Sequence, residues 1–214
     1  MIVDMNHIHP TAIIGENVIL GDNVRVGAYS IIVGNVKIGD NTTIYSHCNI
    51  GTIGEFPGKQ DEELQQNVGV LIGKNCVIRE SVTIHSAVTP NEFTVIEDNC
   101  YIMNKCHIGH DCKLSKNAVI CVAAILGGYA KIGKYTYVGI NSSIHQRSNI
   151  GSYCIIGGQS FFKGDSVDGV TWVGVPAIPR KVNEFSLEKN VNNIQEKIEI
   201  SNLANKFIEE WVKK

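Results

Sequence analysis

A hydrophobic residue recurs at every sixth position along most of the chain. The period holds over residues 8–50, resumes at Ile72 and again at Ile96, and continues to Phe162. A small residue, such as Val18, commonly lies four positions after the hydrophobic one. An amphipathic helix needs a period near 3.6 and a flat sheet a period near 2, so neither fits. A period of six is typical of a parallel β-helix, in which each hexad supplies one short strand and one corner.

This hexad pattern resembles the hexapeptide-repeat, left-handed parallel β-helix family. The resemblance implies that three hexads form one triangular coil of about 18 residues, and that the coil winds left-handed. Twenty-three hexads then correspond to seven to eight coils. We therefore predict an all-β domain over residues 1–182, a left-handed parallel β-helix.

Three segments depart from the period. Residues 56–71 and 86–95 break the register and are predicted as loops. Long excursions from a solenoid are usually functional or interface segments, with tolerated surface insertion as the alternative. Residues 183–214 predict a short α-helical extension that caps the coil or packs on a neighbour. Hydrophobic residues there fall at helical spacings: Ile194, Ile198, Phe207 and Trp211.

Composition narrows the class of protein. The 214 residues are 43% hydrophobic and 19% charged, which allows a sizeable core and excludes wholesale disorder. The formal net charge of −2 offers no electrostatic footprint for nucleic acid or an anionic membrane. The N-terminus has no basic region followed by an apolar run, and no stretch approaches the length of a membrane span. We therefore expect a cytoplasmic protein.

The seven cysteines are predicted to be core residues. No CxxC pair occurs, and an odd count argues against a disulfide framework. A small hydrophobic residue in a stacked core column suits a free cysteine. All except Cys121 occupy the small position four after a hydrophobic residue: Cys48, Cys76, Cys100, Cys106, Cys112 and Cys154.

Counting hexads, with the loops skipped, predicts which side chains share a wall. One face should carry the hexads that begin at Ile50, Ile84, Ile108, Leu126, Ile144 and Phe162. Both loops leave from this face. Glycines clear space between the polar residues that follow these positions. The residues expected to cluster there are His85, His110, His145 and Gln146, with His107 at the adjoining corner.

The residue types in this cluster favour acyl transfer. His110 precedes Asp111, so the imidazole could accept a proton while the carboxylate fixes its tautomer. Gly128, one coil further on, could offer a backbone N–H to a developing oxyanion. Two alternatives stay open. His85, His107 and His110 could bind zinc, or His110 could be purely structural.

Three motifs are more specific than the hexads. The runs IRESVTIH (78–85), HIGHDC (107–112) and SSIHQ (142–146) resemble bacterial UDP-N-acetylglucosamine O-acyltransferases. They also resemble the related enzymes that N-acylate nucleotide-linked amino sugars. The resemblance implies a homotrimer with each active site between two subunits.

The same resemblance implies roles for single residues. His110 matches the family's general base, Asp111 its partner and Gly128 the oxyanion donor. His107, His145 and Gln146 match residues that line the cleft for substrate and acyl donor, and His85 ends the matched 78–85 run. In the first loop, Gln60 and Asp61 look like the family's pair that contacts the nucleotide sugar.

Three departures separate the chain from the UDP-N-acetylglucosamine O-acyltransferase of lipid A synthesis, called the lipid A enzyme below. Tyr129 stands where that enzyme usually has histidine. The C-terminal part is shorter than in that enzyme and, over residues 183–214, carries five Lys, six Glu and no Arg, which offers little attraction to an acidic carrier protein. The run WVGVPAIPRK (172–181) resembles the ending of CoA-dependent acetyltransferases. Candidates for meeting CoA phosphates are Lys163, Arg180 and Lys181, with a solvated basic turn as the alternative.

The leading functional prediction is transfer of an acetyl or short acyl group from acyl-CoA to the amine of a nucleotide-linked amino sugar. The first alternative is the 3-O-acylation of UDP-N-acetylglucosamine in lipid A biosynthesis, with acyl carrier protein as donor. A zinc-dependent protein like the γ-class carbonic anhydrases and a non-catalytic β-helix scaffold are the other two. No permanently bound cofactor or metal is expected for the leading prediction.

Overall fold

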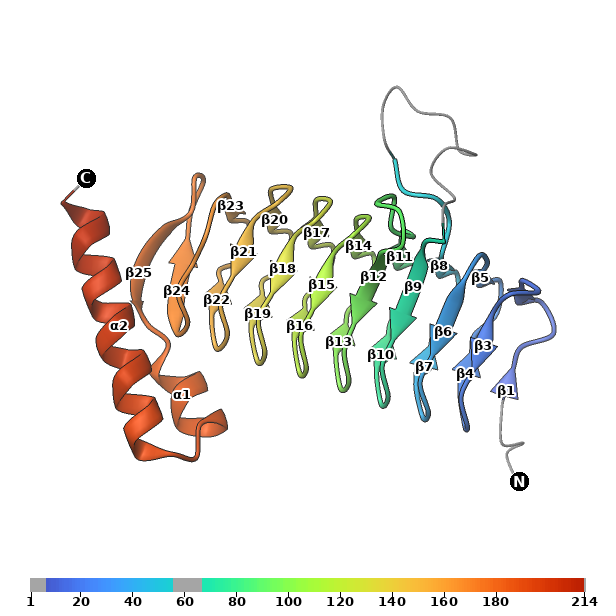
Figure 1. Cartoon of the computed structure of the whole chain (residues 1–214), viewed down its shortest axis with the longest axis horizontal. Helices are drawn as coiled ribbons and strands as arrows, with labels where there is room; N and C mark the ends of the chain where they lie inside the picture. The colour runs from blue at the N-terminus through green and yellow to red at the C-terminus, as the bar shows by residue number, and fades with distance from the viewer. Residues whose placement is uncertain (1–6, 56–66, 214) are drawn as a thin grey trace.

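The chain forms a solenoid of very short strands that fall in turn on three sheets (Figure 1). The computed structural model describes residues 7–55 and 67–213. Sheet A contains β1 (His7–Ile8), β4 (Arg25–Val26), β7 (Thr43–Ile44), β10 (Val77–Ile78), β13 (Tyr101–Ile102), β16 (Val119–Ile120), β19 (Tyr137–Val138), β22 (Ile155–Ile156), β24 (Val170–Val173) and β25 (Ile178–Val182). Sheet B contains β2 (Ile13–Ile14), β5 (Ile31–Ile32), β8 (Asn49–Ile50), β11 (Thr83–Ile84), β14 (His107–Ile108), β17 (Ile125–Leu126), β20 (Ser143–Ile144) and β23 (Phe161–Phe162). Sheet C contains β3 (Ile19–Leu20), β6 (Val36–Ile38), β9 (Gly69–Ile72), β12 (Phe93–Ile96), β15 (Lys113–Leu114), β18 (Lys131–Ile132) and β21 (Asn149–Ile150).

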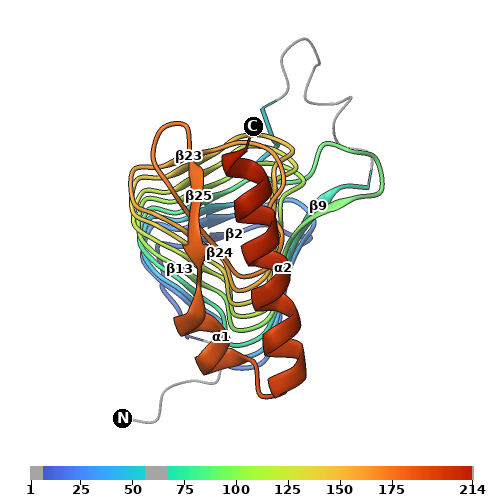
Figure 2. The ribbon, with the colours of Figure 1, turned by 90° about the vertical axis from the view of Figure 1, so that its left-hand side faces the viewer.

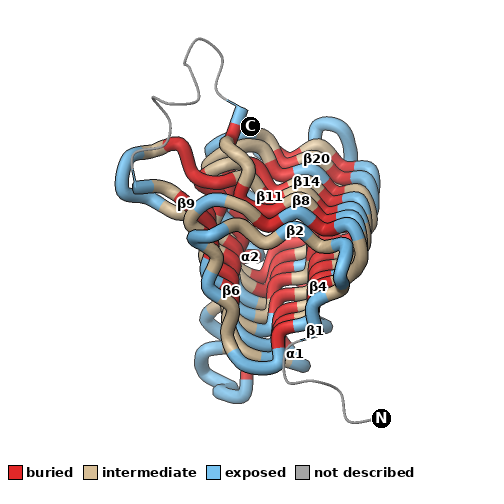
Figure 3. The backbone as a smooth tube through the Cα atoms, turned by 90° about the vertical axis from the view of Figure 1, so that its right-hand side faces the viewer, coloured by how far each residue is buried: buried red, intermediate tan, exposed pale blue. Residues whose placement is uncertain are grey.

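Each two-residue strand points one side chain outward and the next inward. In β14, for example, His107 is half-buried on the outside and Ile108 is fully buried. Backbone hydrogen bonds join successive turns, as Gly109 N–H donates to the Leu126 carbonyl at 2.9 Å. All pairings between these strands are parallel except β24 with β25. The predicted parallel β-helix is therefore confirmed, and Figure 3 shows the buried stretches repeating in register from turn to turn.

The corners rely on residues that tolerate the left-handed backbone region. Asparagine does so more readily than most residues because its short side chain bonds locally. Asn75 and Asn99 both have positive φ, and the Asn75 side-chain amide donates to that of Asn99 one turn above at 3.3 Å. Asn23 and Asn41 repeat the arrangement at 3.1 Å. Stacked amides thus continue the ladder through the corners.

The predicted face is confirmed. Ile84 pairs with Ile50 on one side and with Ile108 on the other, so the hexads named above all lie on sheet B. The predicted loop boundaries were wrong at their C-terminal ends. Residues 69–71 and 93–95 belong to β9 and β12, which are longer than most strands and pair over four residues.

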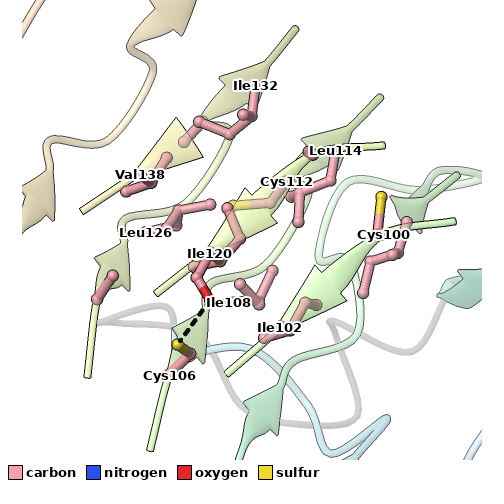
Figure 4. Close-up of a cluster of buried hydrophobic side chains, with 14 of the residues drawn as sticks. Cys100, Ile102, Cys106, Ile108, Cys112, Leu114, Ile120, Leu126, Ile132 and Val138 are labelled. Atoms are coloured by element: carbon pink, nitrogen blue, oxygen red, sulfur yellow. Dashed lines mark hydrogen bonds between the residues drawn. The ribbon is translucent and has the colours of Figure 1, made fainter. Parts of the chain in front are cut away.

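The interior is a column of aliphatic side chains interleaved with cysteines (Figure 4). All seven cysteines are buried and free, which confirms their prediction as core residues. The Cys106 thiol donates to the Cys121 carbonyl at 2.9 Å, so the sulfur also satisfies a corner carbonyl. Burial raises the pKa of the Cys112 thiol to about 12, which makes it a poor nucleophile.

Two helices follow the last strand, α1 (Glu184–Asn190) and α2 (Ile194–Val212), and α2 lies across the C-terminal end of the solenoid (Figure 2). Trp172 is buried there, with its ring against Phe162, Phe207 and Trp211. Ile194 is 72% exposed, so the predicted apolar face of the helix was wrong at that end. Neither helix of the described part combines the length and the apolar character that a membrane span requires.

Candidate active site

His110 sits in the corner that follows β14, enclosed by two glycines. Only 13% of its side chain is exposed. On one side, a Cβ at Gly54, a few residues after β8, would collide with the His110 Cβ. On the turn after, a Cβ at Gly128 would come within 2.5 Å of the His110 Nε2. The imidazole therefore occupies a slot that exists because Gly54 and Gly128 have no side chains.

Asp111 holds the imidazole from the other side. Its Oδ2 lies 2.8 Å from the His110 Nδ1, and the carboxylate is almost fully buried. Since an ionised carboxylate only accepts, Nδ1 carries the proton and Nε2 carries the lone pair. Nε2 is also the ring nitrogen that lies against Gly128. The arrangement orients a base toward the backbone of the next turn.

The second loop, after β11, holds the Asp111 carboxylate through hydrogen bonds. The backbone N–H groups of Val88 and Thr89 donate to Asp111 at 3.0 and 3.3 Å, and the Asp111 N–H donates to the Thr94 hydroxyl at 2.9 Å. Asp111 has a φ of 60°, a backbone state that these bonds stabilise. Burial alone would raise the pKa of Asp111, but the bonds from His110, Val88 and Thr89 outweigh it and lower the pKa.

The Gly128 backbone N–H is placed to serve as an oxyanion donor. In the described part of the chain it donates to no other backbone group, whereas the N–H of Tyr129 donates to the His110 carbonyl at 2.9 Å. A backbone N–H without a backbone partner, beside a base, can stabilise a developing negative charge.

Two further histidines lie beside His110. The His85 and His107 rings meet edge to face with centroids 4.8 Å apart. Burial lowers the pKa of both, and the positive charge of a neighbouring imidazole lowers each further, while Glu55 opposes the shift. Both are therefore neutral at pH 7 and can donate or accept hydrogen bonds in the cleft.

The remaining predicted residues spread more widely. His145 follows β20, two strands along sheet B from β14 and hence roughly 10 Å away. Its Nδ1 bonds the carbonyl of the exposed Gln146 at 2.9 Å, and its ring meets Phe161. Gln60 and Asp61 lie outside the described residues.

The three basic candidates do not form one patch on a single sheet. Lys163 follows β23 on sheet B, whereas Arg180 and Lys181 lie in β25 on sheet A. All three are exposed. Their assignment to CoA phosphates therefore stays a prediction that this geometry does not strengthen.

The zinc alternative finds no support. Residues 7–55 and 67–213 contain no group of three or more His, Cys, Asp and Glu side chains that could hold a metal ion. His110 already uses Nδ1 on Asp111, and His85 and His107 face each other edge to face.

Two residues of the site were missed from the sequence as contributors. The Tyr129 ring meets His110 edge to face with centroids 5.0 Å apart, and the Arg147 guanidinium carbon lies 4.1 Å from the Tyr129 ring centroid. The spacing would have found them. Asp111, Tyr129 and Arg147 lie at equal intervals of one turn and share a corner and a positive φ.

Comparison with known proteins agrees with this fold. Residues 17–52 match the bacterial transferase hexapeptide (six repeats) family. The structure of UDP-N-acetylglucosamine acyltransferase from Campylobacter jejuni superimposes with a TM-score of 0.78 at 30% identity, covering 93% of this chain and 81% of that one. The LpxA structure from Acinetobacter baumannii gives 0.77 at 27% identity, covering 91% and 81%. Fold and site thus define a hexapeptide-repeat acyltransferase, as predicted.

The sequence comparisons identify the family within that class. The acyl-[acyl-carrier-protein]–UDP-N-acetylglucosamine O-acyltransferase of Campylobacter lari is 37% identical over 212 residues, covering 92% of this chain and 80% of that protein. The protein of the same name from Bartonella henselae is 34% identical over 202 residues, covering 85% and 72%. This chain belongs to the UDP-N-acetylglucosamine O-acyltransferase family. The names of these relatives favour the predicted alternative and do not support the leading prediction of acyl-CoA and a sugar amine.

Proposed function

We propose that this protein transfers an acyl group from an acyl carrier protein thioester to a hydroxyl of UDP-N-acetylglucosamine. One observation carries the proposal: a histidine with its Nδ1 on a buried carboxylate and its Nε2 beside the backbone of Gly128. The names of the two relatives supply the donor and the acceptor.

The reaction follows from these groups. His110 Nε2 takes the proton of the sugar hydroxyl as its oxygen bonds to the thioester carbonyl carbon. The carbonyl oxygen becomes an oxyanion, which the Gly128 N–H stabilises. Asp111 stabilises the imidazolium. When the intermediate collapses, the C–S bond breaks and the imidazolium returns the proton to the departing thiolate.

The other assignments form part of the same proposal. His85, His107, His145 and Gln146 are assigned to the cleft, and the motif resemblance assigns Gln60 and Asp61, which lie outside the described residues, to the nucleotide sugar. Lys163, Arg180 and Lys181 have a role only with the alternative donor, acyl-CoA, whose phosphates they would contact.

We further propose a left-handed winding, a homotrimer with sites between subunits, and a cytoplasmic location. Residues 1–182 form the acyltransferase domain and residues 183–214 its extension. The similarity to hexapeptide-repeat family members supports the winding, and the motif resemblance described above implies the trimer.

The test is a two-by-two assay. Acyl carrier protein and CoA thioesters are each offered with UDP-N-acetylglucosamine and with a UDP-linked amino sugar, and thiol release and product mass are followed. The proposal expects turnover with the carrier protein and UDP-N-acetylglucosamine. His110→Ala should then lose about 10²–10⁴-fold in kcat, as removal of a general base does. His47→Ala, an exposed histidine stacked on Tyr29, is the matched control. Turnover only with CoA and the amine would reject the proposal.

A further inference from the structure

The Tyr129 ring, called the platform below, contacts both His110 and an arginine. Its ring centroid lies 5.0 Å from that of the imidazole, and the Arg147 guanidinium carbon lies 4.1 Å from the same tyrosine centroid. The Tyr129 hydroxyl accepts a hydrogen bond from Thr89 at 3.2 Å, and the Thr89 N–H donates to Asp111. The platform is thus tied to the same loop that holds the carboxylate.

The backbone of Arg147 is also fixed against the site. Its N–H donates to the Gly128 carbonyl at 2.9 Å, and its φ of 63° repeats the corner conformation of Asp111 and Tyr129. The side chain therefore starts one turn beyond the proposed oxyanion donor. Stacking then holds the planar guanidinium one ring away from the imidazole.

Arg79 also stacks on a tyrosine, but its guanidinium has additional partners within the chain. Arg79 stacks on Tyr45 at 4.5 Å, but its guanidinium also pairs with Glu80 at 3.0 Å and donates to the Tyr101 hydroxyl at 3.2 Å. Within residues 7–55 and 67–213, Arg147 forms no ion pair with a carboxylate, and its side chain is exposed. Its planar fork of donors fits a phosphate or a carboxylate in two-point contact.

We propose that Arg147, stacked on Tyr129, binds the diphosphate of the nucleotide-sugar acceptor and so sets acceptor affinity. This rests on the proposed function. The sugar diphosphate is favoured over the phosphate of the donor's pantetheine arm for a reason of reach. A sugar ring puts its first phosphate only a few bonds from the reacting hydroxyl, whereas the arm's phosphate lies at the far end of a long chain from the thioester. Arg147 lies one ring from the base that must meet that hydroxyl.

Kinetics of Arg147→Gln test the assignment. A lost hydrogen bond to a charged group predicts an acceptor KM about 10- to 100-fold higher. The kcat should stay within about threefold and the donor KM unchanged, because the reacting groups are intact. Arg147→Lys should recover only part of the affinity, since an ammonium lacks the planar fork. Tyr129→Leu should raise the acceptor KM as well, by releasing the guanidinium. Arg79→Gln is the matched control and should leave both KM values unchanged.

A second measurement separates this inference from the proposed function. UDP is titrated calorimetrically into the wild type and into Arg147→Gln, without any donor or turnover. Binding to the wild type that weakens about 10- to 100-fold in the variant supports the inference even if no acylation is found. Equal UDP affinity in both proteins, no UDP binding to the wild type, or a rise confined to the donor KM would overturn it. Acylation without any effect of Arg147 would leave the proposed function standing and reject this inference alone.

Discussion

Gly128→Ala is the most direct test of how the base is held. The added Cβ would lie 2.5 Å from the His110 Nε2 and 2.6 Å from Cε1, closer than real Cβ contacts come. The φ of Gly128 is outside the left-handed region, so alanine adds no backbone strain there. The three nearest atoms to the new methyl group all belong to the imidazole, so the substitution perturbs it directly, beside the proposed oxyanion donor.

The imidazole cannot easily retreat from that methyl group. Its Nδ1 is bonded to Asp111, and its Cβ packs against Gly54, which follows β8. A displacement of about 1 Å would cost about 10²-fold in kcat/KM. Crowding should lower the free energy of unfolding by about 1–3 kcal/mol.

The assay is steady-state acylation, with thiol release as readout, together with urea unfolding. Gly158→Ala is the control, because the nearest atom to its added Cβ is 3.4 Å away, an ordinary contact, and should leave rate and stability unchanged. A Gly128→Ala protein with wild-type kcat/KM would show that the base does not need this slot, and the proposed site would be refuted.

Three other perturbations give clear expectations. Asp111→Asn should lower kcat by about 10²–10⁴-fold. Folding lowers the pKa of Asp111, so the stability that its charge contributes is present above about pH 4 and is lost as the pH falls through the folded-state pKa. Urea midpoints of the wild type and the variant, measured against pH, test this. Folding also lowers the pKa of His85 and His107, so the unfolded chain binds more protons below about pH 6.5 and the melting temperature should fall there. A His85→Gln, His107→Gln double variant whose melting temperature falls equally steeply with pH would contradict this. Trp211→Ala should cost about 1–3 kcal/mol of unfolding free energy, less than a fully buried residue because Trp211 is 38% exposed, whereas Phe185→Ala, at 74% exposed, should cost little in the same urea titration.

Much of the site was predictable because a solenoid repeats one local rule. Each turn contacts only its neighbours, so counting along the chain places side chains in space. That count put His110 beside Gly128, as found, and predicted that both loops leave after the sheet B strands that prove to be β8 and β11. It also identified the inward cysteine column.

Other parts of the site depend on contacts that no local rule describes. The bonds from Val88 and Thr89 to Asp111 come from a loop without a period, and its strand β12 begins earlier than predicted. The stack of Arg147 on Tyr129 depends on side-chain rotamers, although the spacing of one turn was visible.

The sequence by itself determined the winding into short parallel strands, the composition of the core and the wall on which the histidines gather. All three follow from a period that fixes which side chains point inward. Only the tertiary structure decided how the second loop clamps Asp111, which face of α2 covers Trp172, and that Arg147 reaches Tyr129. These contacts join segments of different periodicity or depend on a choice among rotamers, so their geometry is set by packing in three dimensions rather than by spacing along the chain.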